Sequence, residues 1–307
     1  MSLDAKPDRI EFRLRGDPVT TYHFEPAAAK PYLWPLNAPG GVPVTRAWPL
    51  DKAGAVTDDH PHHVSAWFCH GDVIPEGVNF TRKGKGVDGV DFWAVGSGHG
   101  VIAYVEAGRP EGNHVRTRNE WRIPNGPVVL AETRTLSLHD VAGGRLIVMT
   151  TDLTPAGGPV VFGDTKEGAF GIRVSDQLRV GDKKGKNAKS KITNAAGRDG
   201  EKACWGYPSD WCDYSGEVDG KAVGVAVFDD PANRPRACWH VRDYGLLAAN
   251  PFGREKSGFP AMRGRHDLVR LDKGEHLKLR YAIFLHAGDA AGGKVAEAFE
   301  QFTKTRD

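Results

Sequence analysis

The sequence predicts an all-β protein, a large antiparallel β-sandwich with a single C-terminal helix. Three observations support this fold class. Apolar and polar residues alternate along most of the chain, 38 Gly and 20 Pro separate these alternating runs, and a helical spacing of apolar residues occurs only near the C-terminus. Since Gly and Pro favour turns, the pattern predicts many strands joined by short connections.

Alternation predicts each strand in turn. The clearest run places Leu277, Leu279, Tyr281, Ile283 and Leu285 on one face of a half-buried strand. Similar runs predict further strands at residues 11–14, 101–106, 113–123, 128–138, 146–153, 169–174, 222–228 and 237–241.

The tail predicts the only helix. Val295, Phe299 and Phe302 recur at spacings of four and three within residues 292–307. We expect this helix to cover the edge of a sheet.

Length and composition predict one β-sandwich domain over residues 1–307, because all-β domains often exceed 200 residues. A galactose-mutarotase-like supersandwich is one form that such a sandwich can take. The absence of a fixed repeat argues against a propeller. Residues 181–200 are rich in Lys, Gly and Asn, and we expect them to form an exposed excursion.

Charge and hydropathy restrict the partners. The 41 Lys and Arg nearly balance the 39 Asp and Glu, and the net charge of +2 offers no global field for nucleic acid or an anionic membrane. No run approaches the roughly 20 apolar residues of a membrane span. We expect a cytoplasmic protein, or a secreted or periplasmic one if a leader has been removed. The four cysteines form no CxxC pair and are expected to be free thiols. Nothing in the sequence indicates the oligomeric state.

A histidine cluster, DDHPHHVSAWFCHGD at residues 58–72, is the first candidate site. If this segment is extended, His60, His62, His70 and Asp72 share one side, and His63 lies on the other. Crowded imidazoles bind protons less readily unless a metal or anion compensates. We therefore expect His60, His62 and His63 to be catalytic, and His60, His62 and His70 to be able to hold one divalent metal. Hydrogen-bonded structural histidines are the alternative.

Two further segments carry polar residues suited to chemistry. In VVFGDTKEGAFGIRV, residues 160–174, Lys166 and Glu167 lie in a turn where burial could tune one of them as an acid or base. An exposed ion pair is the alternative there.

The third segment is ACWHVRDYGLLAANPFG, residues 237–253. His240 and Asp243 are candidates for proton transfer. Four residues are candidates for binding a sugar, which needs aromatic faces and planar polar groups: Trp239, Arg242, Tyr244 and Asn250. The alternative is a buried aromatic strand.

These segments, with VNFTRKGKGVDGVDFW and GVAVFDDPANRPRACWHVRDYGLLAANPFG, resemble a bacterial family of unknown function labelled "methane oxygenase PmoA-like", of the DUF6807 type. The resemblance runs from about residue 32 to 286. It implies a soluble β-sandwich protein of sugar catabolism. Its carried-over positions are His60, His62, His63, Lys166, Glu167, His240, Arg242, Asp243 and Asn250.

The leading hypothesis is a carbohydrate-active enzyme: a lyase, hydrolase or epimerase that acts on a sugar or an oxidised sugar derivative by His, Glu and Asp acid-base catalysis. Its partner would be a small carbohydrate. A non-catalytic carbohydrate-binding protein is the first alternative. A mononuclear metal-dependent oxygenase, with His60, His62 and Asp72 as ligands, is the second.

Overall fold

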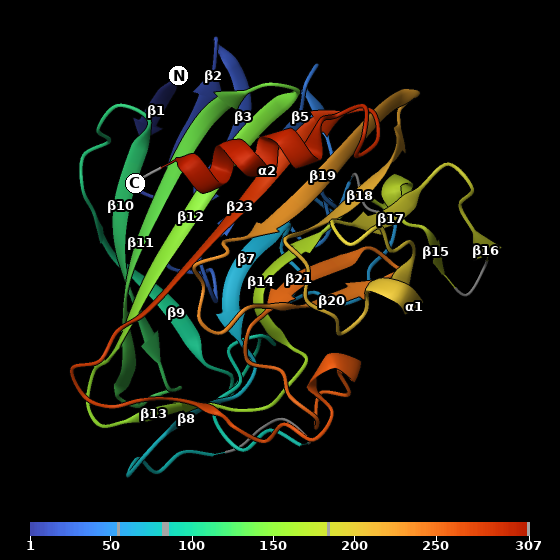
Figure 1. Ribbon diagram of the computed structural model, residues 1–307. Coiled ribbons are helices and arrows are strands. Elements are labelled where there is room, and N and C mark those ends of the chain that lie inside the picture. The colour runs from blue at the N-terminus through green and yellow to red at the C-terminus, as the bar shows by residue number, and fades with distance from the viewer. Residues whose placement is uncertain (54–55, 82–85, 183–184, 306–307) are drawn as a thin grey trace.

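Two eight-stranded antiparallel sheets form the body of the protein (Figure 1). The computed structural model describes residues 1–53, 56–81, 86–182 and 185–305. The first sheet has the strand order β1 (Ser2–Ala5), β2 (Arg9–Leu14), β3 (Asp17–His23), β4 (Tyr32–Leu33), β7 (Ala66–His70), β14 (Gly168–Arg173), β21 (Leu246–Asn250) and β20 (Cys238–Arg242).

The second sheet contains the longest strands. Its order is β17 (Lys191–Asn194), β18 (Trp211–Val218), β19 (Lys221–Asp229), β23 (Leu277–Ala287), β12 (Gly144–Pro155), β11 (Val128–Val141), β10 (His114–Arg122) and β9 (Val101–Ala107). The predicted all-β antiparallel sandwich is therefore confirmed, and the expected strands lie within these elements.

Smaller elements complete the described chain. A three-stranded sheet has the order β22 (Val269–Leu271), β13 (Val160–Phe162) and β8 (Val73–Pro75). Two hairpins pair β5 (Asn37–Ala38) with β6 (Val42–Pro43), and β15 (Gly181–Asp182) with β16 (Gly185–Lys186). The helical elements are η1 (Asp176–Leu178), α1 (Glu201–Cys204), η2 (Pro260–Met262) and α2 (Val295–Lys304).

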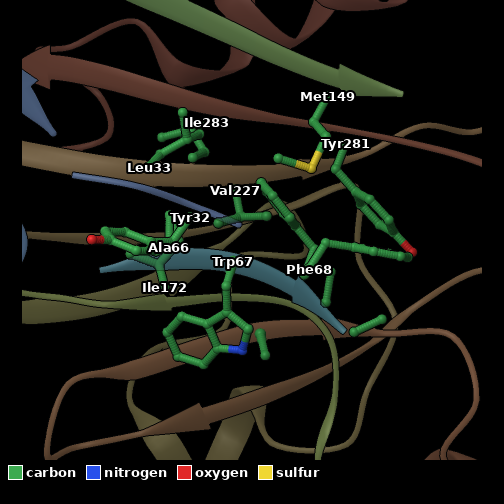
Figure 2. Packing of buried hydrophobic residues seen from close by; sticks show 14 of the residues in the cluster. Tyr32, Leu33, Ala66, Trp67, Phe68, Met149, Ile172, Val227, Tyr281 and Ile283 are labelled. Atoms are coloured by element: carbon green, nitrogen blue, oxygen red, sulfur yellow. The ribbon is translucent and has the colours of Figure 1, made fainter. Parts of the chain in front are cut away.

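The main core lies between the two large sheets. Phe170 of the first sheet stacks on Tyr281 of the second, with ring centroids 5.3 Å apart, and Phe68 also contacts Tyr281. Figure 2 shows Phe68 with Met149, Tyr281 and other side chains of the second sheet. Burying each such side chain contributes about 1.5–3 kcal/mol, and this packing fixes the position of β7 and β14.

An ion pair is buried in this core. Arg134 donates from Nε to Oε1 of Glu132 at 2.5 Å, and both side chains are fully buried. The other carboxylate oxygen accepts from the indole nitrogen of Trp121 at 2.8 Å, and Arg134 also reaches the hydroxyl of Tyr22 on β3. The pair therefore joins the second sheet to the first by polar contacts.

Helix α2 lies across the outer face of the second sheet, and the expectation that it covers a sheet edge was wrong (Figure 1). Its apolar face buries Val295, Ala298 and Phe302 against residues such as Phe228 and Phe284. Because α2 covers that face, β23 is buried on both sides over much of its length, whereas simple alternation predicts one exposed face.

The excursion expected at residues 181–200 is shorter in the structure. Only the β15–β16 hairpin departs from the sheets, and residues 183–184 lie outside the described residues. Strand β17 returns to the edge of the second sheet, because Ile192 is apolar and becomes buried there. All four cysteines are buried free thiols. Within the described ranges, no helix has the length and apolar composition that a membrane crossing requires.

Candidate functional site

The outer face of the first sheet carries the candidate site. Register places Phe170 opposite Phe68 on the core side, so the neighbouring pair Gly171 and Trp67 faces outward. Figure 2 shows the Trp67 ring on the side of β7 away from the core. A Cβ atom on Gly171 would lie 2.8 Å from the Trp67 ring, so glycine is required there for the ring to lie flat on β14.

The histidine segment is a turn and not an extended strand. His60 has a φ of 45°, and the backbone NH of His63 donates to the carbonyl of His60 at 2.9 Å. The expectation that His63 lies opposite His60 and His62 was therefore wrong. Pro61 cannot continue a strand ladder, and the turn brings all three imidazoles to the same side.

The rings form a stacked column. Tyr244 stacks on His60 with centroids 5.2 Å apart, His60 stacks on His63 at 4.8 Å, and His63 stacks on Trp67 at 5.2 Å. His62 meets the His63 ring edge-on at 4.5 Å. The column runs from a half-buried Tyr244 and a 40% exposed His60 side chain at its accessible end to a fully buried Trp67 at its inner end.

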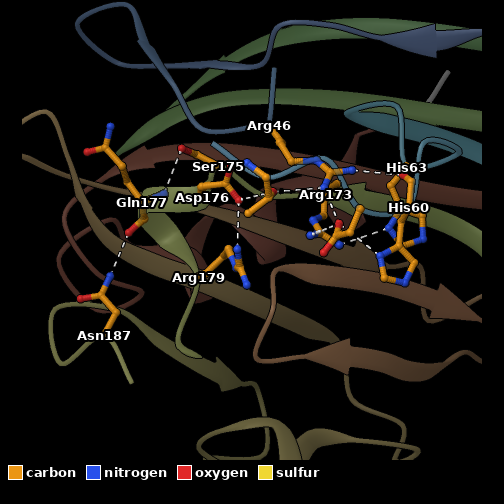
Figure 3. Close-up of polar contacts among 11 residues, drawn as sticks. Arg46, His60, His63, Arg173, Ser175, Asp176, Gln177, Arg179 and Asn187 are labelled. Atoms are coloured by element: carbon orange, nitrogen blue, oxygen red, sulfur yellow. Dashed lines mark hydrogen bonds and ion pairs between the residues drawn. The ribbon is translucent and has the colours of Figure 1, made fainter. Parts of the chain in front are cut away.

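Asp59 pairs with two arginines beside this column, Arg46 and Arg173, which Figure 3 shows near His60 and His63. Its Oδ1 atom accepts from Arg46 at 2.5 Å and from Arg173 at 2.7 Å, and lies 3.1 Å from Nδ1 of His60. Although partial burial opposes ionisation, Arg173 and the hydrogen bonds from His60 and Arg46 hold the pKa of Asp59 below its usual value. An ionised Asp59 only accepts hydrogen bonds, so Nδ1 of His60 carries a proton.

Arg173 fixes the protonation of His63 as well. Its guanidinium lies 3.3 Å from Nδ1 of His63, and because arginine can only donate, Nδ1 is the acceptor. Burial, followed by His62 and Arg173, lowers the pKa of His63 well below its usual value. Burial and the positive charge of Lys30 lower the pKa of His62 to about 3. Both imidazoles are therefore neutral at physiological pH.

The second candidate segment contacts the third. Nδ1 of His240 donates to the carbonyl of Lys166 at 2.7 Å, and Nζ of Lys166 lies 2.6 Å from Oε1 of Glu167. His240 is almost fully buried, and burial together with Arg242 lowers its pKa to about 3. His240 therefore holds the turn by a neutral hydrogen bond, while Lys166 and Glu167 stay partly exposed.

Tyr244 connects the segments. Its ring covers His60 on one side, and the Arg173 guanidinium lies 4.7 Å from its centroid. Burial raises the pKa of Tyr244 to about 12; Arg173 opposes this shift and Glu167 adds to it. The first and third segments therefore meet at the Tyr244 ring, and the second segment joins the third through the His240–Lys166 hydrogen bond.

Arg242 and Asp243 adjoin this region at the end of β20. Arg242 stacks on Trp205, with its guanidinium carbon 4.0 Å from the ring centroid, and donates to Glu201 at 2.8 Å. The backbone NH of Asp243 donates to the other Glu201 oxygen at 2.6 Å. Helix α1 thus holds Arg242 in place, and Asp243 lies in the β20–β21 turn.

Two predicted sugar-binding residues have structural positions instead. Trp239 faces the core, is fully buried and donates to the carbonyl of Ser209, because register puts it opposite Ala249 on the inner face. Asn250 is also buried, and its amide bonds the carbonyl of Thr165 and the backbone NH groups that follow it. Both side chains are therefore engaged in hydrogen bonds within the fold, and their roles in sugar binding remain predictions.

The predicted metal sets are not assembled. His70 is buried at the C-terminal end of β7, where its Nε2 forms a 2.9 Å hydrogen bond with the carbonyl of Gly163. Asp72, the carboxylate of the proposed oxygenase triad, is buried there too and accepts from the backbone of Gly89. Strand β7 separates both from His60 at about 3.3 Å per residue. Among the described residues, no group of three His, Cys, Asp or Glu is positioned to hold a metal ion.

Two cavities adjoin the histidine cluster. One, of about 280 Å³, is lined by Lys30 and Val64 together with Glu25, Tyr32 and Leu50. The other, of about 430 Å³, is lined by Trp34, Thr45, Arg46, Asp176 and Gln177 among others. Arg46 contributes to this second cavity and to the Asp59 ion pair, and none of the three histidines lines either cavity.

A family model described as a family of unknown function (DUF6807) matches residues 9–300. The chain belongs to this family. The match gives no activity, so the methane-oxygenase label remains a prediction. No curated protein matches the DUF6807 chain.

Among solved structures, the DUF6807 chain is similar to the 4-alpha-glucanotransferase from Thermococcus litoralis, at 10% identity and a TM-score of 0.28. The alignment covers 91% of this chain and 37% of that one, so the chain spans little more than a third of the length of the glucanotransferase. A similarity of this size supports no conclusion about function.

Several site residues of this family member escaped sequence reasoning. Arg173 ends the buried run GAFGIR, where a charged residue after five small or apolar ones indicates a buried partner. Lys30 and Arg46 carry no such signal. Trp205 lies in an aromatic stretch, CWGYPSDWCDY, but nothing local indicates that its ring covers Arg242 and His240.

Depressed histidine pKa values predict that acid destabilises the protein. Burial lowers the pKa of His240 to about 3 and that of His70 to about 4, against 6.5 in the unfolded chain. Below pH 6.5 the unfolded state binds more protons, so the free energy of unfolding falls with pH until these folded-state values are reached. At pH 5 each of these two histidines should lower the free energy of unfolding by about 2 kcal/mol relative to neutral pH. Urea titrations at pH 7.5 and pH 5 measure this loss.

His286 changes stability with pH in the opposite direction to His240 and His70. Although burial disfavours its charge, Asp213 at 2.8 Å raises its pKa, so this residue stabilises the fold below pH 6.5 and reduces the net loss. Between pH 7.5 and pH 5 the His240→Asn variant should lose about 2 kcal/mol less of its free energy of unfolding than the wild type. An unchanged pH dependence in that variant contradicts a neutral buried His240.

Proposed function

We propose that this protein is a carbohydrate-active enzyme, a lyase, hydrolase or epimerase, that uses His60 as its general base. The observation that carries the proposal is the Asp59–His60 pair at the accessible end of the ring column. Asp59 accepts a hydrogen bond from the protonated Nδ1 of His60, which leaves the lone pair of Nε2 available to a substrate. A carboxylate that orients a histidine in this way is a recurring arrangement in acid-base catalysis.

Glu167 supports the proposal as the second acid-base group. Its side chain is partly exposed, lies 2.6 Å from the Lys166 ammonium and influences the charge of the Tyr244 hydroxyl. Proton-transfer catalysis at a sugar needs one group to remove a proton and another to return it. His60 and Glu167 could fill these roles around Tyr244.

The surroundings of the pair suit a sugar. Tyr244 and Trp205 are partly exposed aromatic residues, and Arg242 and Lys166 are partly exposed donors. Pyranose C–H faces stack on aromatic rings, while sugar hydroxyls need polar partners in fixed positions. These four side chains offer both kinds of contact, and Tyr244 lies directly against His60.

A sugar panel tests the proposal. Neutral mono- and disaccharides, uronates and ketoses are titrated by calorimetry, and each binding compound is then incubated with the protein and analysed by NMR for product. The expected result is binding with conversion of at least one compound. Binding without conversion of any compound identifies a carbohydrate-binding protein and contradicts the enzyme proposal. Absence of binding across the panel contradicts both.

A further inference from the structure

His63 presents a fixed hydrogen-bond donor to the site. Arg173 occupies its Nδ1 atom as donor, so the neutral imidazole carries its proton on Nε2. No group among the described residues accepts a hydrogen bond from that Nε2 atom. A neutral imidazole donor is suited to an oxygen that becomes negative during a reaction, since its low pKa keeps it uncharged beforehand.

A base lies directly beside this donor. The His60 ring stacks on the His63 ring at 4.8 Å with an angle of 7° between them. Asp59 holds the proton of His60 on Nδ1, which leaves Nε2 as an acceptor. One imidazole therefore can accept a proton, and its parallel neighbour, with the ring centroids 4.8 Å apart, can donate a hydrogen bond.

The surrounding charge favours a developing anion. Three buried cations face the cluster, Lys30, Arg46 and Arg173, while Asp59 is the carboxylate that pairs with the two arginines. Lys30 donates to backbone carbonyls, and Asp91 is its nearest acidic influence. The two carboxylates leave one positive charge in excess, which can stabilise one negative charge in a water-poor site.

We propose that this site enolises an oxidised sugar, taking a proton from the carbon next to a ketone or carboxyl group. This inference rests on the proposed function and specifies its substrate class. The C–H proton moves to Nε2 of His60 and the C–H electron pair forms the C=C bond. The carbonyl π pair moves to the oxygen, which accepts from Nε2 of His63. Delivery of a proton from a second acid or water to the opposite face of that carbon gives the epimer, with the original proton left on His60 and then lost to solvent. Departure of a substituent on the next carbon with the proton from His60 gives elimination.

Hydrogen exchange in D₂O tests the enolisation. Methyl α-D-glucuronide and 1,5-anhydro-D-fructose serve as carbonyl probes, and methyl α-D-glucoside and 1,5-anhydro-D-glucitol as matched compounds that lack the carbonyl. We expect at least one carbonyl probe to exchange its adjacent C–H roughly 100-fold faster with protein than in buffer. We expect no exchange in the matched compounds.

The outcomes separate this inference from the proposed function. If a sugar of the panel is converted but its product keeps every original C–H hydrogen, with no new alkene, the inference is wrong and a hydrolase remains. If no sugar is bound or converted and neither probe exchanges, the inference and the proposed function both fail.

The state of His63 is tested without any substrate. Two-bond proton–nitrogen NMR of histidine-labelled protein should show a neutral His63 protonated on Nε2 from pH 8 to pH 5. A cationic ring at pH 7, or a proton on Nδ1, overturns the inference. His63→Ala should lower probe exchange about 10²–10³-fold, whereas His114→Ala on β10, a partly exposed histidine of the second sheet, should leave it unchanged. Equal exchange in the two variants also overturns it.

Discussion

Replacing Arg134 by Met is expected to lower the free energy of unfolding by about 3–5 kcal/mol. The substitution keeps the volume of the side chain but leaves the Glu132 carboxylate fully buried with only the Trp121 indole as partner. An uncompensated charge between the two sheets cannot reach water without opening the sandwich. Urea unfolding followed by circular dichroism measures the loss.

The double variant Arg134→Met, Glu132→Leu is the internal comparison. Removing both charges should recover most of the stability, because the penalty comes from the unpaired carboxylate and not from the missing arginine. Arg118→Met, which breaks an exposed ion pair with Glu106, should cost under about 1 kcal/mol. Equal losses for Arg118→Met and Arg134→Met disagree with this assignment.

Replacing His60 by Gln is expected to lower kcat on the sugar identified in the panel by about 10²–10⁴. Glutamine keeps a polar side chain of similar size, so Asp59 retains a hydrogen-bond donor while the base is removed. Because 40% of the His60 side chain is exposed, the fold should tolerate the change. Steady-state kinetics at pH 7.5, with circular dichroism as a check on folding, provide the measurement.

Two companion variants sharpen the result. His114→Gln removes a partly exposed histidine on the second sheet and should leave kcat unaltered. Asp59→Asn should lower kcat and also destabilise the fold, since Arg46 and Arg173 lose their common carboxylate. Full activity in a folded His60→Gln protein rejects His60 as the base.

Alternation of apolar and polar residues predicts the strands well, but it does not predict which element covers the face of a sheet. A strand that is apolar on one face is predicted to be half-buried, and β2 and β10 follow this rule. The outward apolar residues of β23, such as Phe284, become buried only because α2 crosses that face. Whether a helix covers the face of a sheet or its edge depends on long-range packing, which no local pattern specifies.

The sequence predicts the types of residue in the candidate site, but it does not predict how their side chains are oriented. Residue types identified His60 and Tyr244, and the two rings stack in the structure. The sequence does not specify which face of a strand points into the core. Trp239 and His240 are neighbours in β20, so one side chain points into the core and the other points outward. The Arg173 contact with His63 joins residues 110 positions apart, which no local pattern specifies.

The strand order β7, β14, β21, β20 has a consequence for how the protein matures. These adjacent strands come from the first quarter, the middle and the last third of the chain, so their hydrogen-bonded register closes loops of about a hundred residues and about seventy residues. A nascent or truncated chain that ends within β20 lacks both Tyr244 and β21. Competence to bind should therefore emerge as one late event, together with completion of the sheet, and any ligand of this surface should act as a reporter of full-length folding.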